Sequence, residues 1–475
     1  MPQLERKLGI WSCISLVAGT IIGSSIFMKP AIMASQVHLP LLLLAVWLIT
    51  GVISIFGGMI NAEVGSVFPE TGGMYVYFRH MYGDFFSFLF GWAGLIVINT
   101  ASIAGIAFLF AQYSDYVIHL PRFDATTEHS FAITIPFIGK LFWLENIGVK
   151  LSAIALILLL TVINIRSVKA GAYVQVFFTI IKLLAITFLV TGIFLSGKGN
   201  VSNFYTTKTE VHFSGWEIIT GMIAACSGAL AAYDGWIVLG YAAGEVKNPS
   251  RNIPKGLLIG ISICIIAYIF TNQAYLYMLP IDDMKLSQHV ATDAYEKAAG
   301  FMGGGFIAVL VMISTIGGVN GNVLPCARLN YAMATEGRLF KSVATVHPRY
   351  KTPVTSLWLQ CIISSLFVLS GSFDMLMDMF VFIAWIFYGF LGYGVIVLRH
   401  KMPEAQRSYK VWGYPYVPIV FVAFSAFYFV VTIYNEVSNY NAGRAPVINS
   451  LLGLALTATG VPFYFYFKRK YGNSI

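Results

Sequence analysis

The sequence predicts an all-α polytopic membrane protein, and this prediction rests on composition, hydropathy and charge. Of the 475 residues, 57% are hydrophobic and only 11% are charged, and the mean hydropathy is +0.75. A soluble domain has about 25% charged residues, so a soluble protein of this composition could not cover its surface. The net charge of +9 fits cytoplasmic loops rich in Lys and Arg better than a surface for nucleic acid.

Apolar stretches that suit membrane-spanning helices recur along the whole chain, and each needs about 20 residues. Twelve such stretches lie near residues 9–33, 39–64, 83–117, 150–166, 171–197, 215–241, 255–279, 301–332, 354–371, 374–398, 413–435 and 446–467. The first is too long for a signal peptide and lacks a convincing cleavage site, so it is expected to remain as a span. Residues 1–400 are expected to form a core of ten spans, and residues 401–475 a further pair, helices 11–12.

The loops predict the orientation. If the N-terminus is cytoplasmic, the inner loops contain more Lys and Arg than the outer loops, in which Lys29 and Lys150 are counted. The positive-inside rule then favours both termini in the cytoplasm. The longest outer loop, residues 118–149, is expected to form a short hairpin or to lie on the membrane surface, and the sequence does not decide between these.

The first apolar stretch contains an interruption, VAGTIIGSSIF (17–27). Gly19, Thr20, Gly23, Ser24 and Ser25 fall within seven residues of what is otherwise an apolar run. One interpretation is close helix packing, because Gly19 and Gly23 have the GxxxG spacing. The other is a helix broken at membrane depth, which is tolerated only where the backbone is buried in protein or lines a cavity.

The sixth stretch contains a second interruption, SGALAAYDGW (227–236), with five small residues and Asp234. The two interruptions lie five spans apart, so each one opens a block of five spans. Interrupted helices at corresponding positions of two halves are the best sequence indication of a transporter binding site. We therefore expect broken helices 1 and 6 in a 5+5 inverted repeat.

Two adjacent breaks offer complementary charges to a ligand. The start of a half-helix presents free N–H groups that suit an anion, and the end of a half-helix presents C=O groups that suit a cation. A zwitterionic amino acid has this charge pattern. Gly23 lets a ligand approach the backbone, and Ser24 and Ser25 can add hydroxyl groups. Asp234 is expected either to attract the ammonium group of the ligand or a cationic side chain, or to cap a half-helix of span six.

Lys182 lies in the middle of the fifth stretch, about ten or more residues from either end. A lysine at this depth costs about 2.5–3.5 kcal/mol on insertion scales, so we expect it to face the interior of the bundle. Its ammonium group could do the work of a bound sodium ion, or it could titrate. These two roles predict different energetics.

The chain resembles the L-type amino acid transporter branch of the amino acid–polyamine–organocation superfamily. The resemblance covers essentially the whole chain and rests on four blocks in order: GTIIGSSIF (19–27), FPETGGMYVY (68–77), AYDGW with GEVKNPSRNIPK (232–236 and 244–255), and ARLNYAMATEGRLF with HPRYKTP (327–340 and 347–353). It implies the LeuT fold and sodium-independent amino acid transport, usually by exchange. It also implies a prokaryotic permease in the cell membrane.

The resemblance also implies site residues. The substrate carboxylate would meet the backbone at Gly23, Ser24 and Ser25, and the ammonium group would meet carbonyls near Ile21 and at Ala231 to Asp234. Lys182 would tie span one to span eight near Gly318 and Asn320. The candidate substrate-binding residues are therefore Thr20, Ile21, Ile22, Gly23, Ser24, Ser25, Ala231, Ala232, Tyr233, Asp234 and Gly235.

Three features depart from the pattern of this branch. Ser25 stands where glycine is usual, and Ala231 stands where many relatives have an aromatic residue that covers the substrate. The loop 118–149 has no cysteine, whereas animal members use one there to bind a glycoprotein heavy chain. A transporter without a disulfide-linked heavy chain is therefore expected.

The leading hypothesis is exchange of small neutral amino acids by alternating access. The second is proton-coupled symport of an amino acid or amine, with Lys182 as the titrating group. A nutrient sensor built on a transporter fold is a distant third. The chain has no HExxH motif and no pore-loop signature, so an enzyme or channel is not expected, and neither is a cofactor or metal.

Overall fold

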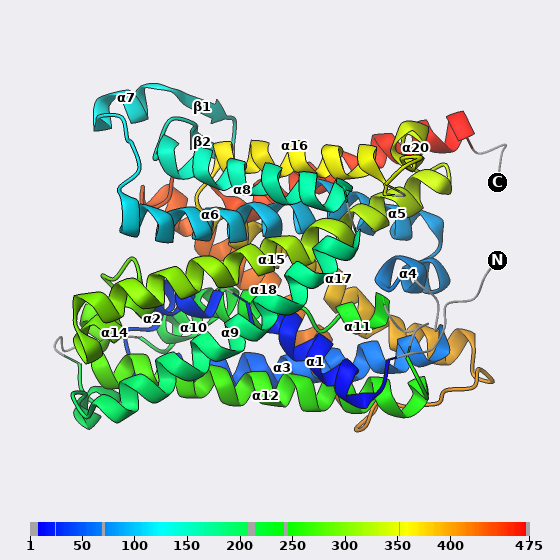
Figure 1. Cartoon of the computed structure of the whole chain (residues 1–475). Helices are drawn as coiled ribbons and strands as arrows, with labels where there is room; N and C mark the ends of the chain where they lie inside the picture. Colours follow the sequence, from blue (N-terminus) through cyan, green and yellow to red (C-terminus); the bar gives the residue numbers. More distant parts are fainter. Residues whose placement is uncertain are drawn as a thin grey trace.

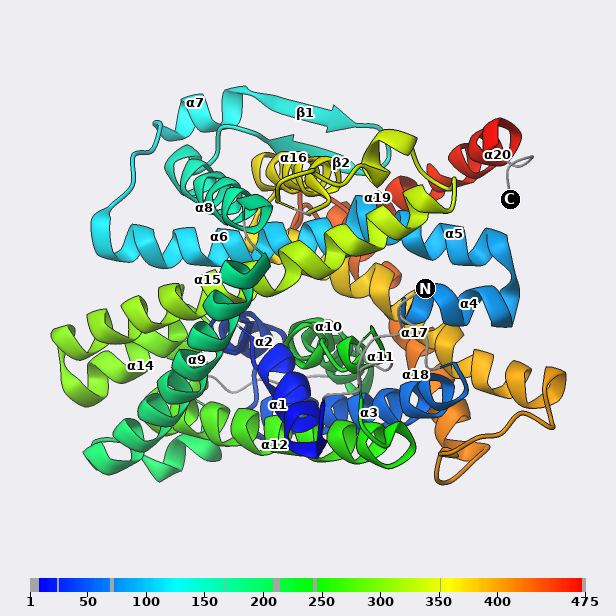
Figure 2. The ribbon, with the colours of Figure 1, turned by 45° about the vertical axis from the view of Figure 1, so that its right-hand side comes forward.

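The protein is almost wholly helical, as the composition predicts (Figure 1). The computed structural model describes residues 8–23, 25–68, 72–166, 168–207, 214–241, 246–350 and 352–471. In Figure 2, α1, α3, α10 and α12 lie together in the lower part of the bundle, and α5, α6, α8 and α16 lie above them. Contacts between α12 and α3, α1 and α12, α6 and α8, and α16 and α6 agree with this division.

The elements of the first half of the chain are α1 Ile10–Ile21, η1 Ser25–Phe27, α2 Lys29–Val37, α3 Pro40–Val67, α4 Met74–Tyr82, α5 Asp84–Ala93, η2 Gly94–Ile98, α6 Asn99–Ile118, α7 Ala125–Ser130, β1 Ala132–Ile135, β2 Gly139–Phe142, α8 Ile147–Arg166, α9 Val168–Ser196 and η3 Val201–Phe204. Those of the second half are α10 Gly215–Tyr233, α11 Val238–Tyr241, α12 Pro249–Met278, α13 Ile281–Met284, α14 Val290–Ala299, α15 Phe301–Thr335, η5 Lys341–Ala344, α16 Val354–Ser370, α17 Phe373–Lys401, α18 Tyr416–Asn441, α19 Asn449–Ala458 and α20 Gly460–Tyr471.

Helices occupy all of the apolar stretches named above. Within the described residues, nine helical segments are long and apolar enough to cross a membrane, and Ile10–Ile21, Ile180–Leu195 and Val354–Ser370 are shorter apolar helices. The polytopic all-α class is therefore confirmed, whereas the count of twelve spans stays a prediction. The helices α18 and α19 both contact α17, and the division at residue 400 also stays a prediction.

The loop after α6 forms a hairpin, one of the two arrangements left open by the sequence. Strands β1 and β2 pair antiparallel, with Ala132 opposite Phe142. The buried ammonium group of Lys150 donates to Phe142 O at 2.6 Å and to Leu369 O, near the end of α16, at 3.0 Å. Helix C-termini present free carbonyl groups that favour a cation, so Lys150 fastens the hairpin to the bundle.

The far end of α17 is held to α3 by a buried carboxylate. Glu63, only 2% exposed, accepts from Arg399 Nε at 2.8 Å and from Arg399 Nη2 at 2.7 Å. Arg407 Nε lies 3.5 Å from the same carboxylate, and the backbone N–H of Val411 donates to it at 2.6 Å. Two arginines and one amide thus compensate a charge that would be costly to bury alone.

Candidate functional site

The first helix is broken, at a position slightly later than the sequence suggested. Thr20 and Ile21 belong to the last turn of α1, and Ile22 leaves the helix with φ −64° and ψ 90°. Gly23 follows, the short η1 begins at Ser25, and Ser24 lies outside the described residues. Gly19 is helical, so the expected start of the break at Gly19 is wrong by about one turn.

The second break is confined to the end of the predicted interval. The helix α10 continues through Tyr233, so the small residues from Ser227 onward are helical, and the expected start at Ser227 is wrong. Gly228 is small because α10 packs against α2: a β-carbon there would lie 2.8 Å from Met33 Cγ. The chain leaves the helix at Asp234 and turns at Gly235, whose φ is +128°.

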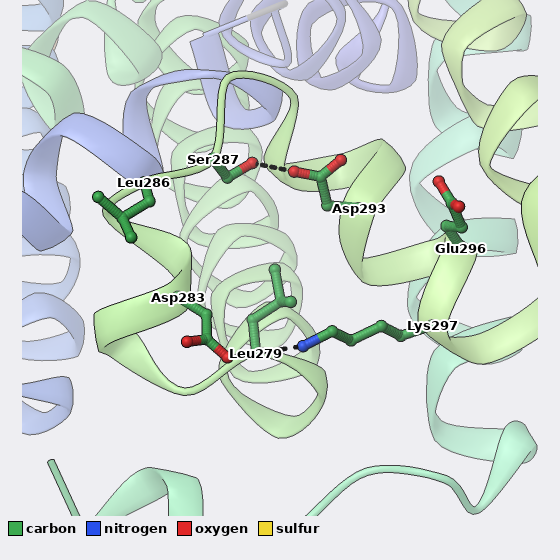
Figure 3. A pocket seen from close by; sticks show the side chains of 7 residues that line it. All are labelled: Leu279, Asp283, Leu286, Ser287, Asp293, Glu296 and Lys297. Carbon is green, nitrogen blue, oxygen red and sulfur yellow. Dashed lines mark hydrogen bonds and ion pairs between the residues drawn. The ribbon is translucent and has the colours of Figure 1, made fainter. Parts of the chain in front are cut away.

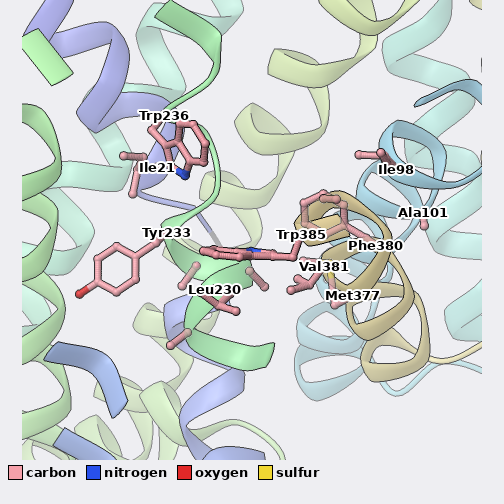
Figure 4. Packing of buried hydrophobic residues seen from close by; sticks show 14 of the residues in the cluster. Ile21, Ile98, Ala101, Leu230, Tyr233, Trp236, Met377, Phe380, Val381 and Trp385 are labelled. Atoms are coloured by element: carbon pink, nitrogen blue, oxygen red, sulfur yellow. The ribbon is translucent and has the colours of Figure 1, made fainter. Parts of the chain in front are cut away.

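The two breaks are in direct contact, as the argument for a zwitterion site requires. The hydroxyl oxygen of Thr20, which lies 2.7 Å from Leu16 O in its own helix, also lies 3.3 Å from the carbonyl oxygen of Gly235. A β-carbon on Gly235 would lie 3.0 Å from the carbonyl carbon of Thr20 and 3.1 Å from the amide nitrogen of Ile21. Figure 4 shows the side chains of Ile21 and Trp236 beside each other at this junction. Only glycine allows this approach and this φ together.

Tyr268, in the middle of α12, joins the two breaks through one hydroxyl group. Its oxygen lies 2.8 Å from Ile21 O and 3.0 Å from Ala232 O, and it accepts from the N–H of Gly23 at 3.4 Å. The side chain is fully buried. Tyr268 was not among the residues predicted from the sequence, although a tyrosine in the middle of a span is a signal from which a buried hydrogen bond could have been predicted.

We expect Tyr268→Phe to weaken amino acid binding by about fivefold to a hundredfold. Without the hydroxyl group, the carbonyls that it serves at both breaks lose a donor, which costs about 1–3 kcal/mol. The control is Tyr275→Phe on the same helix, because the buried hydroxyl of Tyr275 has no hydrogen-bond partner among the described residues. Equilibrium binding of radiolabelled serine to the purified proteins compares them. Equal affinity in both variants would contradict the role given to Tyr268.

Lys182 lies at the first break, as expected for a functional intramembrane lysine. Its side chain is 3% exposed, and Nζ lies 3.3 Å from Ile22 O and 3.5 Å from Gly19 O. These carbonyls belong to the C-terminal end of α1, where backbone acceptors lack helical partners. The ammonium group therefore supplies positive charge to the negative end of a half-helix.

We expected Lys182 to link span one to span eight. The hydrogen bonds of Lys182 among the described residues are those to Gly19 O and Ile22 O, at the end of α1. Asn320, on α15, accepts from the Nδ2 amide of Asn164 on α8 at 2.8 Å. Gly318 faces α6 instead, and a β-carbon there would lie 3.1 Å from Ile106 Cγ2. The structure thus brings Lys182 together with the first break, and Gly318 and Asn320 with α6 and α8.

Asp234 occupies the C-cap position of α10, and it also has a partner that neither sequence-based alternative named. Its Oδ1 accepts from the hydroxyl group of Tyr388, on α17, at 2.5 Å. The Tyr388 ring packs against Trp236 with centroids 4.9 Å apart. Ala231, Ala232 and Tyr233 precede it in the buried last turn of α10. The carboxylate thus links the second break to α17.

The sequence profile of the family described as amino acid permease matches residues 8–456. The chain belongs to this family. A b(0,+)-type amino acid transporter 1 of Homo sapiens is 32% identical over 468 residues, which cover 98% of this chain and 88% of that protein. The serine/threonine exchanger SteT of Bacillus subtilis is 31% identical over 471 residues, 98% of each chain. The large neutral amino acids transporter small subunit 2 of Homo sapiens is 32% identical over 463 residues, 97% of this chain and 80% of that one.

Family membership confirms the resemblance found from the four sequence blocks, and with the apolar helices it makes this permease a multi-pass membrane protein rather than an enzyme. Each of the four blocks has residues outside the described part of the chain: Ser24, residues 69–71, residues 244–245 and Lys351. The helix α4 begins within the second block, at Met74, and the helix α12 begins within the third block, at Pro249.

A hollow of about 580 Å³ lies apart from the breaks, where α12 ends and α13 and α14 follow (Figure 3). Its lining residues are Leu279, Asp283, Leu286, Ser287, Asp293, Glu296 and Lys297. In Figure 3, Ser287 faces Asp293 and Lys297 reaches toward Asp283, and these pairs lie 2.5 Å and 3.7 Å apart. This lining includes none of the predicted substrate-binding residues.

Proposed function

We propose that this permease is a sodium-independent amino acid exchanger that carries small neutral amino acids across the cell membrane by alternating access. The observation that carries the proposal is the contact between the two broken helices at Thr20 and Gly235. Discontinuous helices that meet in this way give transporters of inverted-repeat folds their binding site near the membrane midplane. The cytoplasmic location of both termini, and residues 1–400 as the transport core, belong to the same proposal.

The substrate carboxylate would bind the amide groups that follow the first break, at Gly23, Ser24 and Ser25. A half-helix start carries about half a positive charge, and Gly23 leaves the backbone open because its β-carbon would meet only Ile21 O, at 3.5 Å. The ammonium group would bind carbonyls at the ends of α1 and α10, near Ile21 and Ala231 to Asp234. Lys182 would hold the first break in shape without sodium, because its ammonium group already lies on the carbonyls that end α1.

The activity for which one relative is named supports a hydroxylated or other small substrate. The serine/threonine exchanger covers 98% of this chain, and Ser25 and Ala231 are the positions at which we expect the substrate preference to be set. The human relative named small subunit 2 belongs by its name to a larger assembly. We propose that this chain works without a disulfide-linked heavy chain, because its loop 118–149 has no cysteine.

The test is counterflow in proteoliposomes. Vesicles loaded with unlabelled serine, in sodium-free buffer, should take up external radiolabelled serine much faster than empty vesicles. Equal uptake by loaded and empty vesicles would remove the exchange proposal, and a requirement for sodium would remove the sodium-independent part.

A second candidate function is proton-coupled symport with Lys182 as the titrating group. It is favoured by the position of a buried amine at the break itself, since buried lysines are among the groups that take part in proton transfer. An imposed pH gradient that drives net uptake into empty vesicles, and fails to do so in Lys182→Met, would select this function over exchange.

A further inference from the structure

Lys29 is buried, although the sequence placed it in an outer loop. It is the first residue of α2, the half-helix that follows the first break, and only 1% of it is exposed. An ammonium group buried without partners would be far too costly, so its partners decide what it does.

Two carboxylates at the start of α17 hold this ammonium group. Lys29 Nζ lies 2.8 Å from Asp374 Oδ1 and 3.1 Å from Asp378 Oδ1. The two aspartates are four residues apart and thus share one face of α17. The ring of Phe373 lies 5.3 Å from the same nitrogen. The segment after the first break is therefore attached to α17 by its first charged residue.

The same carboxylate also holds the helix that precedes the second break. The hydroxyl group of Ser227, on α10, donates to Asp378 Oδ1 at 2.7 Å. One oxygen atom of α17 thus receives hydrogen bonds from α2 and from α10. We name Lys29, Ser227, Asp374 and Asp378 the latch, because these residues fasten the half-helices on one side of both breaks to a third helix.

The latch lies on the side of the molecule that carries the hairpin. Asp374 lines a cleft of about 320 Å³ together with Asn146 and Val149, which adjoin the hairpin, and with Met28 and Ser35 around α2. The carboxylates of Asp374 and Asp378 are 42% and 31% exposed, whereas Lys29 is buried. Water can therefore reach the acidic half of the latch, and this lowers the cost of separating the charges compared with a fully buried pair.

Within the described part of the chain, the start of the same broken helix has exposed residues. Trp11, at the start of α1, is 77% exposed, and Ser12 and Ser15 are exposed as well. The described residues thus join the half-helices to α17 on the hairpin side, whereas the first turn of α1 carries exposed side chains at its other end. A transporter that opens to one side at a time needs such a difference between its two sides.

We infer that the latch closes the hairpin-side approach to the paired breaks, and that it must separate each time the permease opens toward that side. Lys29 and Asp378 are then positioning residues, which set the balance between the two openings without touching the substrate. This inference rests on the proposed transport by alternating access, and it adds the residues that control one of the two openings.

The experiment measures access to the cleft without any substrate. Ser35→Cys places a thiol in the cleft, and its labelling by a membrane-impermeant maleimide is followed from the hairpin side of proteoliposomes. The same protein without this cysteine gives the background from the native thiols, and Thr134→Cys on the exposed β1 strand reports reagent access unrelated to the latch.

In the Ser35→Cys protein, Lys29→Met and Asp378→Asn should each raise the labelling rate at least about fivefold, the lower end of typical coupling between conformational states. Labelling of Thr134→Cys should not change. The exchanged pair Lys29→Asp with Asp378→Lys keeps the charges of the latch and should restore slow labelling. Ser227→Ala, which leaves the ion pairs in place, should give a smaller increase.

Unchanged labelling in Lys29→Met and Asp378→Asn would overturn the inference, and so would an exchanged pair that labels as fast as the single variants. If Lys29→Met or Asp378→Asn does not elute as monodisperse protein, Ser227→Ala takes its place. An unchanged labelling rate in Ser227→Ala would then contradict the inference. Because labelling needs no substrate, a failure of serine counterflow in the wild type would be recognised separately.

Discussion

Replacement of Gly235 by alanine should lower serine exchange by at least about tenfold. The residue has φ +128°, and its β-carbon would press on backbone atoms of Thr20 and Ile21 at 3.0 and 3.1 Å. Strain of this kind costs about 1–3 kcal/mol, and 1.4 kcal/mol already corresponds to a factor of ten. Since the crowded atoms are backbone, they can yield only if the two breaks move apart.

The matched control for this variant is Gly215→Ala, at the first position of α10, the helix that ends just before Gly235. A β-carbon on Gly215 meets none of the described residues within 4 Å, and Gly215 is absent from the positive-φ positions. Counterflow in proteoliposomes measures both variants at equal protein content. If Gly235→Ala exchanges serine at the wild-type rate, the close contact between the breaks has no part in transport.

Lys182→Met should reduce exchange by about tenfold to a hundredfold. The substitution keeps much of the side-chain length but removes the donor to Ile22 O and Gly19 O. A hydrogen bond to a charged group contributes about 1.5–3 kcal/mol. Because both hydrogen bonds of Lys182 are long, we expect their combined loss to cost about as much as the loss of one such bond. Lys182→Arg, which keeps a fixed charge, should retain part of the exchange.

Lys150→Met is the control for the loss of a buried lysine. Lys150 is also buried and also donates to backbone carbonyls, but these lie in the hairpin and at the end of α16. We expect that variant to lower thermal stability while serine binding stays normal. A Lys182→Met protein that exchanges serine normally yet no longer responds to a pH gradient would instead support the titrating role.

The sequence predicted the elements and the existence of both breaks because these follow from local patterns. Long apolar runs identify helices in a membrane, and clustered small residues mark the two places where the helices are interrupted. The exact break points were less predictable. Gly228 is small to fit Met33 within an intact helix, whereas Gly235 is small to allow a positive φ. Composition alone does not separate these two reasons.

The residues missed by the sequence analysis act over long separations along the chain. Lys29 pairs with carboxylates 345 and 349 residues away, and Tyr268 reaches the first break across 247 residues. The local surroundings of Lys29 resemble those of a loop residue, since it precedes Pro30 at the start of a helix. Only the packing of α2 against α10, with α17 beside α10, gives it partners.

The most direct test of the central claim, that the paired breaks bind the amino acid, is serine binding to Gly23→Val. A β-carbon at Gly23 has room, since Ile21 O at 3.5 Å is its one contact among the described residues, and Gly23 is absent from the positive-φ positions, so the protein should fold normally. The added methyl groups would occupy the proposed carboxylate position. We expect unchanged thermal stability in the absence of substrate and a loss of radiolabelled serine binding of at least about tenfold, which corresponds to 1.4 kcal/mol. A folded Gly23→Val protein that binds serine with wild-type affinity would contradict the assignment of the site.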